Sequence, residues 1–322
     1  MTMRRIIVAG AGQIGSRYLQ GLAKLTEPSE IWAYDISQDS LDRALQRWEE
    51  VPSSLLHRLK TISDLDEVKG TFDLAILSGT ADSRPYLVSI LSKQAKVRAW
   101  LLEKLLAQSI SGLRLIRDSI PEDAPAWVNT PMMTYPLYQQ LIPRLNGTPV
   151  EARFLNITGV ACNSIHYVDF VARLRNADVK SVSVDGLREW TPYVKRPWLF
   201  DAEGFMGVSY SDGSILSVSG VSATRSNGVE FSIRSLHDSS RYWNIYEQSG
   251  RAVSAEGEEL NGEGFCFQSD STPILVNKIF SRSDTGLPTL DESLRQHEPI
   301  LEAFLRHWNL VMPDKRAELP IT

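Results

Sequence analysis

The sequence predicts an α/β protein of two domains. The first is an N-terminal Rossmann domain, a doubly wound parallel sheet, and the second is a C-terminal α+β domain with a largely antiparallel sheet. Three observations predict this: a glycine-rich turn near the N-terminus, alternating strand and helix patterns up to about residue 130, and a change of pattern after Pro131. A chain of 322 residues suits two domains rather than one. We therefore expect domains at residues 1–130 and 131–322.

The glycine-rich turn lies between a predicted strand and a predicted helix. The apolar run Arg5–Ala9 leads into Gly10-Ala11-Gly12-Gln13-Ile14-Gly15, and a helical pattern follows from Ser16 to Leu25. In such a motif the first glycine permits the tight turn, the second lets a pyrophosphate approach, and the third allows close helix–strand packing. The N–H groups at the start of the helix, at Gln13 and Ile14, then face the phosphates. The alternative is a glycine-rich turn that binds no ligand.

An acidic residue completes the motif. Asp35 stands 20 positions after Gly15, at the end of a second predicted strand, Ile31–Tyr34. A carboxylate there accepts hydrogen bonds from the adenosine ribose and repels a 2′-phosphate. Because the next basic residue is Arg43, the sequence favours NAD, and NADP is the less favoured cofactor. Asp35 could instead be the N-cap of the next helix, a role that Ser37, Asp39 or Ser40 could also fill.

The rest of the first 130 residues continues the alternation of strand and helix. Helical spacing recurs around Leu41–Trp48, and short apolar runs at 72–77, 97–102 and 126–128 read as strands. After Pro131 we expect strands at 150–158 and 179–184 with a helix at about 164–175 between them. Residues 204–236 are strand-rich, with turns at 211–213 and 226–228, and two helices follow at about 271–282 and 290–308.

Composition excludes several classes of protein. The net charge of −5 favours neither nucleic acid nor an anionic membrane as a partner. Two cysteines, Cys162 and Cys266, offer neither a disulfide framework nor metal-site spacing, so no metal is expected. The apolar run before Gly10 is too short for a signal peptide or a membrane span, so we expect a cytoplasmic protein.

Two further segments suggest chemistry. The predicted strand Trp100–Leu102 ends on Glu103-Lys104, and His166-Tyr167-Val168-Asp169 lies in the helix of the second domain. Together with the glycine motif, Asp35 and the segment 287–293, these features resemble the glucose–fructose oxidoreductase/inositol dehydrogenase/MocA-like oxidoreductases. The similarity spans nearly the whole chain. It implies an NAD-dependent enzyme with both domains described above.

The resemblance implies roles for the first of these pairs. Glu103 and Lys104 would lie at the cofactor, with Lys104 reaching the substrate and the nicotinamide ribose. Its ammonium group would polarise the reacting oxygen. Without the resemblance, Lys104 reads as an ordinary lysine beside a strand. The family usually has proline after this pair, whereas this chain has Leu105.

His166 is the best candidate for the acid–base group, because an imidazole titrates near neutral pH. By residue type alone it could be a buried, hydrogen-bonded histidine. Asp169 stands one helical turn later and could orient the ring or bind a substrate hydroxyl. It could also form a solvent-exposed ion pair with Arg173. We expect His297 and His307 on the solvated face of the last helix.

The chain departs from the family at one position. Many members have an aspartate four residues before the histidine, where this chain has Cys162, and a thiol is a weak hydrogen-bond partner. Asn163 is available as an amide that binds substrate. Tyr135 could supply a hydroxyl near the nicotinamide or could be a packed tyrosine.

The predicted function is transfer of a hydride between NAD and a secondary hydroxyl or ketone of a sugar, polyol or sugar derivative. Aromatic and basic residues in the second domain suit a sugar, or else form a loop held by its own tryptophans: Trp190, Tyr193, Lys195, Arg196 and Trp198. One alternative is a sensor that binds the dinucleotide without turnover. Another is a glycoside hydrolase that uses tightly bound NAD.

The second sheet also predicts self-association. Between 204 and 233, apolar residues alternate with Ser, Thr and Gly, and few charges occur along the strands. A sheet face open to water normally carries more charge. We therefore expect a homodimer or homotetramer that forms through this sheet, as the resemblance also implies. The alternative is a face covered by the chain's own loops.

Overall fold

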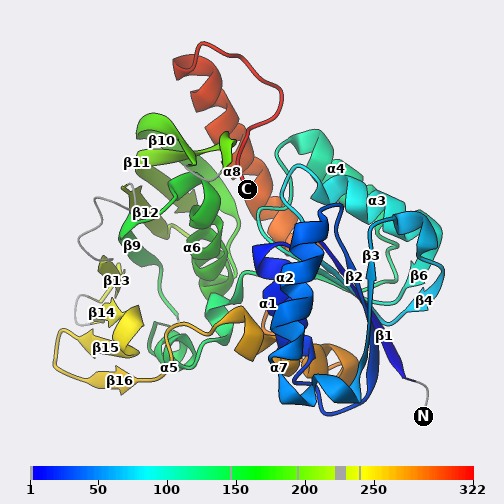
Figure 1. Ribbon diagram of the computed structural model, residues 1–322. Coiled ribbons are helices and arrows are strands. Elements are labelled where there is room, and N and C mark those ends of the chain that lie inside the picture. The colour runs from blue at the N-terminus through cyan, green and yellow to red at the C-terminus, as the bar shows by residue number, and fades with distance from the viewer. Residues whose placement is uncertain (1–2, 146, 194–195, 222–229, 239–240) are drawn as a thin grey trace. The chain divides into compact units, whose positions relative to one another are not determined.

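The computed structural model describes residues 3–145, 147–193, 196–221, 230–238 and 241–322 (Figure 1). They form two compact units. Unit 1 contains residues 1–107, 111–129 and 266–290, and unit 2 contains residues 108–110, 130–265 and 291–322. The chain therefore passes from unit 1 to unit 2 near residue 130 and later returns to unit 1.

Unit 1 is built on a parallel sheet. In the described part of the chain it has six strands in the order β3-β2-β1-β5-β7-β8. Every pair of neighbouring strands is parallel. The strands are β1 Arg4–Ala9, β2 Ser29–Tyr34, β3 Arg58–Ile62, β5 Leu74–Leu77, β7 Trp100–Leu102 and β8 Ala126–Val128, and a small parallel pair joins β4 Gly70–Phe72 to β6 Ala95–Val97. The central strands β1, β5 and β7 are largely continuous apolar runs because helices cover both faces of such a sheet, whereas the edge strand β3 carries the exposed residues Arg58 and Lys60.

The strand order makes the sheet doubly wound. From β1 the chain steps outward through β2 to β3, then returns to β5 and continues on the other side of β1 to β8. Right-handed crossovers therefore place the helices of the two halves on opposite faces. The helices of unit 1 are α1 Gln13–Leu22, α2 Gln38–Glu49, α3 Arg84–Gln94, α4 Ile110–Ser119 and α7 Gln268–Ser281. The predicted Rossmann fold is confirmed.

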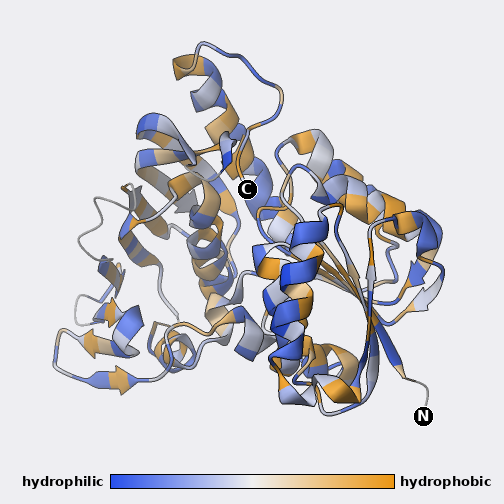
Figure 2. Ribbon diagram, viewed as in Figure 1, coloured by the Kyte–Doolittle hydropathy of each residue, from blue (hydrophilic) through white to orange (hydrophobic). Residues whose placement is uncertain are grey.

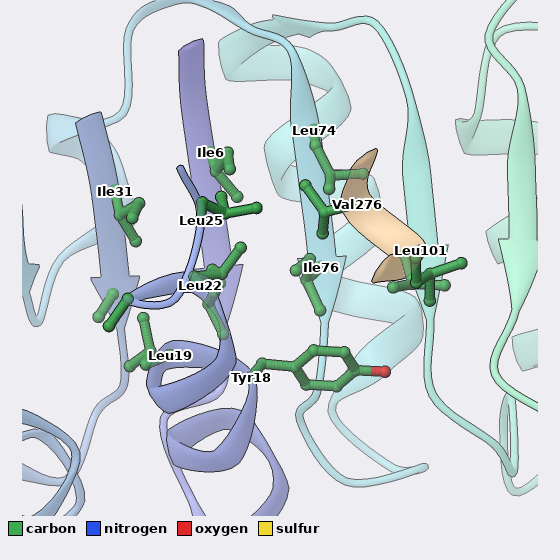
Figure 3. Packing of buried hydrophobic residues seen from close by; sticks show 14 of the residues in the cluster. Ile6, Tyr18, Leu19, Leu22, Leu25, Ile31, Leu74, Ile76, Leu101 and Val276 are labelled. Carbon is green, nitrogen blue, oxygen red and sulfur yellow. The ribbon is translucent and has the colours of Figure 1, made fainter. Parts of the chain in front are cut away.

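The core of unit 1 joins the sheet to α1, α2 and α7. Figure 2 shows apolar residues along the strands and mixed faces on α1 and α2. In Figure 3, Tyr18 extends from α1 toward Leu101 on β7, and Val276 of α7 packs in the same cluster. Each of these three side chains is fully buried. Because α7 packs against α1, residues 266–290 belong to unit 1. The sequence-based prediction had included them in the second domain, residues 131–322.

Unit 2 is built on a mixed sheet that is mostly antiparallel. Its described strands number eight, in the order β10-β11-β12-β9-β13-β14-β15-β16, and β9 pairs in parallel with β12 alone. Their bounds are β9 Val150–Ile157, β10 Val179–Tyr193, β11 Arg196–Tyr210, β12 Ile215–Gly220, β13 Glu230–Ser235, β14 Tyr242–Tyr246, β15 Arg251–Ser254 and β16 Glu259–Asn261. The predicted α+β architecture is therefore confirmed. The turn expected at 226–228 lies outside the described residues.

The described helices of unit 2 pack against this sheet. They are α5 Pro136–Leu145, α6 Val160–Arg175 and α8 Leu290–Val311. α6 packs against β9, β11 and β12, and α5 packs against β15 and β16. The helix α6 is buried along most of its length, from Val160 to Leu174.

The residues expected to form a sugar-binding loop lie in the long hairpin of β10 and β11. Trp190 is buried, and its indole Nε1 donates to His307 Nδ1 across 3.1 Å. The ring also packs edge-on against Trp308. The prediction that His297 and His307 lie on a solvated face is wrong. Their exposed fractions are 2% and 8%, because α8 buries these polar side chains within unit 2 together with its apolar ones. Trp198 remains 64% exposed, and Lys195 lies outside the described residues.

Candidate functional site

The glycine motif has the geometry that a dinucleotide requires. Gly10 has φ +101° and lies against Gly79, whose N atom is 2.4 Å from where a Cβ on Gly10 would stand. A Cβ on Gly15 would lie 1.7 Å from the carbonyl oxygen of Gly10. A Cβ on Gly12 would meet nothing within 4 Å. Two glycines therefore permit close packing of the turn, and the third leaves open space.

The start of α1 is suited to an anion. Gly12 is its N-cap and offers no capping side chain. Gln13 and Ile14, the next two residues, are exposed, Ile14 to 42%. Backbone N–H groups at an uncapped helix N-terminus favour a phosphate. The open space at Gly12 and this helix terminus fit the pyrophosphate of NAD.

Asp35 lies beside this turn, at the end of β2. Its Oδ2 accepts a hydrogen bond from the Ala11 N–H at 2.8 Å, and its Oδ1 accepts one from the Ser37 N–H at 2.9 Å. The N-cap of α2 is Ser37, whose hydroxyl accepts from the Ser40 N–H. Asp35 is therefore free of the capping role and is half-buried next to the glycine turn. Each carboxylate oxygen retains capacity to accept a ribose hydroxyl.

Glu103 and Lys104 follow β7 and have different surroundings. Glu103 is buried and accepts hydrogen bonds from the Tyr18 hydroxyl at 2.5 Å and from Asn129 Nδ2 at 2.6 Å. Lys104 is half-buried, and its peptide bond to Leu105 is cis. Both residues thus lie at the carboxyl edge of the parallel sheet, where ligands of such folds bind. Glu103 connects this edge to α1 through Tyr18.

A buried arginine that sequence reasoning missed lies at the same edge. The guanidinium group of Arg84 donates to the carbonyl oxygens of Leu77 at 3.3 Å, Gly79 at 2.5 Å and Leu105. Burial lowers the pKa of Arg84 to about 10, and the charge of Glu103 opposes this shift. Arg84 therefore ties the end of β5 to the segment that carries Lys104. No local pattern in Ser83-Arg84-Pro85 distinguishes it from a surface arginine.

In unit 2, α6 carries His166 and Asp169. His166 is half-buried, whereas Asp169 is fully buried and accepts from the Thr130 hydroxyl at 2.9 Å. An Arg173 nitrogen lies 3.8 Å from the Asp169 carboxylate. The side chain of Asp169 in this ion pair is buried, so the pair is not the solvent-exposed one that the sequence allowed. Burial raises the pKa of Asp169 to about 7, and Arg173 opposes this shift. A catalytic role for Asp169 stays a prediction.

A second acid, which the sequence did not reveal, lies at the start of α6. Asp201 on β11 is buried, and its Oδ1 accepts from the Ala161 N–H at 2.8 Å. The Tyr193 hydroxyl lies 2.7 Å from Asp201 Oδ2 and 2.8 Å from Cys162 Sγ. A phenol has one proton, so when Tyr193 donates to Asp201 the thiol can donate to Tyr193. Burial is the largest cause that raises the pKa of Tyr193, and the neighbouring Cys162 and Asp201 raise it further.

This cluster places a carboxylate near Cys162. A carboxylate is present at the N-terminal end of α6, although it comes from a strand about 40 residues later. His166 follows Cys162 by one helical turn, at the spacing that makes side chains neighbours. The αL conformation of Gly159, with φ +77°, leaves room for the carboxylate, because a Cβ there would lie 2.4 Å from Asp201 Oδ2.

The two weaker candidates lie in unit 2 with different exposures. Asn163 is half-buried on α6, and its amide Nδ2 donates to the Thr158 carbonyl at 2.7 Å. Tyr135 is 7% exposed and packs against the rings of Tyr138 and Phe265. Tyr135 therefore has the packing of a core tyrosine.

No helix in the described part of the chain has the length and apolar character needed to cross a membrane. No group of three or more His, Cys, Asp or Glu side chains there is arranged to hold a metal ion.

Comparisons with known proteins place the fold. No protein-family model matches this sequence, and no curated protein matches it. An oxidoreductase from Agrobacterium radiobacter, solved with NAD+, L-tartaric acid and magnesium, is similar with a TM-score of 0.70 at 14% identity, over 94% of this chain and 96% of that one. Scyllo-inositol dehydrogenase from Lactobacillus casei, solved with NAD(H) and scyllo-inositol, has a TM-score of 0.68 at 15% identity, over 95% and 98%.

A third similar structure is that of an enzyme named for a sugar nucleotide. UDP-N-acetylglucosamine 3-dehydrogenase from Acidithiobacillus ferrooxidans has a TM-score of 0.68 at 14% identity, over 94% of this chain and 96% of that one. Each likeness covers both units of the chain. The chain therefore has the fold of inositol dehydrogenases and related oxidoreductases, as its resemblance to that family predicted.

Proposed function

We propose that this chain is an NAD-dependent oxidoreductase that acts on a secondary hydroxyl or ketone of a sugar, polyol or sugar derivative. The observation that carries the proposal is the open space at Gly12 beside the Asp35 carboxylate. A turn that needed glycine only for packing would need it at Gly10 and Gly15 alone. The names of the structural neighbours support the substrate class.

Residues of unit 1 would hold the cofactor. Gly10, Gly12 and Gly15 shape the turn, the first turn of α1 at Gln13 and Ile14 receives the pyrophosphate, and Asp35 accepts the ribose hydroxyls. When bound, NAD supplies the group that accepts or gives a hydride. Asp35 favours NAD over NADP because its charge repels a 2′-phosphate.

The reacting oxygen needs two further groups. Lys104 would place its ammonium beside the oxygen and stabilise the negative charge that develops there. His166 would accept the hydroxyl proton on an imidazole nitrogen during oxidation and return it during reduction. Tyr193 and Asp201 supply a hydroxyl and a carboxylate one helical turn before His166, where Cys162 replaces the family's acid.

Two alanine variants test the proposal. We expect Lys104→Ala and His166→Ala to keep the fold and NAD binding, and to lower turnover by two or more decades, the usual scale for such groups. The assay follows NADH at 340 nm across a panel of polyols, sugars and sugar nucleotides. Lys96→Ala and His237→Ala are matched controls, because both side chains are exposed.

Two outcomes contradict the proposal. A wild-type protein that binds neither NAD nor NADP would exclude the oxidoreductase. A protein that binds NAD and keeps full turnover in both alanine variants would show that Lys104 and His166 are not its catalytic residues. NAD binding without turnover on any tested substrate class would favour the sensor, which the cysteine at position 162 also suits.

A further inference from the structure

Arg47 connects α2 to the first turn of α1. It lies in the last turn of α2 and is half-buried. Its Nη2 donates to Gln13 Oε1 at 3.1 Å, and its Nη1 lies 3.4 Å from the Gln13 carbonyl oxygen. The same nitrogen donates to the Ser16 hydroxyl, which itself donates to the Gln13 carbonyl at 3.1 Å. One guanidinium therefore holds both the backbone and the side chain of Gln13.

This contact decides which way the Gln13 amide is oriented. A guanidinium has donors and no acceptor, so the amide atom that faces it must be the oxygen. Nε2 of Gln13, with its two hydrogens, is then left for another acceptor. Gln13 is exposed and is the first residue of α1 after the Gly12 N-cap. The amide N–H groups of its side chain thus lie at the helix terminus that fits a pyrophosphate.

Other cations surround Arg47. Burial of the guanidinium, together with the charges of Arg17 and Arg43, lowers the pKa of Arg47, and only Glu50 opposes this shift. Three arginines therefore share the surface of α1 and α2 beside Gln13. An anionic ligand at the start of α1 would offset their mutual repulsion.

We propose that Arg47 is a positioning residue for the pyrophosphate of the cofactor, and that it acts by holding the Gln13 amide as a hydrogen-bond donor at the first turn of α1. The inference rests on the proposed function and adds to it a residue outside the glycine motif. The ligand chemistry is a diphosphate diester. Neither the adenine nor the nicotinamide is part of what Arg47 selects.

The test compares ligands with and without a pyrophosphate. NAD and ADP-ribose contain it, and adenosine does not. We expect Arg47→Met to weaken NAD and ADP-ribose about tenfold by calorimetry, the scale of one charge-assisted hydrogen bond. Adenosine affinity, followed by ligand-observed NMR, should change less than about twofold. Arg117→Met is the matched control, because Arg117 is exposed on α4 and pairs with Asp118, away from the start of α1.

A double-mutant cycle separates positioning from a merely structural role. If Arg47 acts through Gln13, the variant Gln13→Ala/Arg47→Met binds NAD no more weakly than Gln13→Ala alone, because Arg47 then has no amide left to hold. Arg47→Lys should restore only part of the affinity, because an ammonium cannot hold the amide and the carbonyl with a planar fork.

Three results would overturn the inference. They are unchanged NAD affinity in Arg47→Met, an equal loss for adenosine, and fully additive effects in the cycle. Wild-type protein that binds neither NAD nor ADP-ribose would instead overturn the proposed function. The wild-type titration therefore tells the two failures apart.

Discussion

Tyr193 and Asp201, on the two strands of one hairpin, are joined by a hydrogen bond of 2.7 Å at the start of α6. The same hydroxyl lies 2.8 Å from Cys162 Sγ, and the same carboxylate accepts from the Ala161 N–H. These contacts therefore link the hairpin, the N-terminal end of α6 and Cys162. It gives the turn of α6 before His166 a defined polar environment.

Removal of that hydroxyl should affect turnover more than stability. We expect Tyr193→Phe to lower turnover about tenfold, which corresponds to the loss of one hydrogen bond to a charged group. Steady-state kinetics on the identified substrate give the value, and thermal unfolding checks the fold. Tyr246→Phe is the control, since that ring is 47% exposed. Equal turnover of wild type and Tyr193→Phe would limit the cluster to a role in packing.

Substitution of two glycines in the turn should have different effects: one on the stability of the fold and the other on NAD affinity. We expect Gly15→Ala to destabilise the protein by at least about 2 kcal/mol, because its Cβ would lie 1.7 Å from the Gly10 oxygen. Gly12→Ala should unfold at nearly the wild-type denaturant concentration and bind NAD at least about tenfold more weakly. Denaturant unfolding and calorimetry measure the two effects. Wild-type NAD affinity in Gly12→Ala would mean that no pyrophosphate approaches this position.

Asp35 should determine the choice of cofactor. We expect the wild type to bind NAD more tightly than NADP by about 1–3 kcal/mol, the screened repulsion between the carboxylate and a 2′-phosphate. Asp35→Asn keeps an oxygen for the Ala11 N–H and should narrow this difference. Asp39→Asn, at an exposed position in the first turn of α2, should leave it unchanged. Paired titrations decide the matter, and equal affinities in the wild type would contradict this role.

Asp169 should make stability depend on pH. Its pKa is about 7 in the folded protein and near 3.8 when unfolded, so the folded state binds more protons between these values. The free energy of unfolding should therefore fall as pH rises from about 4 to 7, by at most about 4 kcal/mol from this group. Asp169→Asn should flatten the slope, measured by urea unfolding at several pH values. Glu247, whose pKa is also raised to about 7 by burial, would retain its own contribution. An unchanged slope would show that Asp169 does not retain its proton in the folded state.

The face of the second sheet that carries Ser217 and Ser219 should pair with another copy of the chain. On β12, Ser217 and Ser219 are half-buried, and Phe205 and Ile215 beside them are 44% and 39% exposed. We expect light scattering at micromolar concentration to give at least twice the mass of 36.1 kDa. Ser217→Lys should shift the protein toward the monomer, and Ser249→Lys, on an exposed turn, should not. A stable wild-type monomer would contradict this prediction.

The sequence by itself determined the elements whose signals are local. β1, the glycine turn, α1 and Asp35 fall within the first 35 residues, where neighbours along the chain form the motif. The buried parallel strands were also predicted, because burial on both faces produces continuous apolar runs, whereas the largely exposed strand β3 was not. The position of α6 followed from its apolar pattern. The start of α6 at Val160 could not be predicted in the same way, because the carboxylate that accepts from its first turn belongs to Asp201 and not to a neighbouring residue.

The tertiary structure alone decided how the polar groups are partnered. Glu103 bonds to Tyr18, 85 positions away, and Arg84 donates both to the Leu77 carbonyl at the end of β5 and to the Leu105 carbonyl next to Lys104. α7 belongs to unit 1, although it follows the whole second sheet in the sequence. Periodicity reports which face of an element is buried and not what covers it. A buried polar atom must find a partner, and the fold supplies that partner from distant parts of the chain.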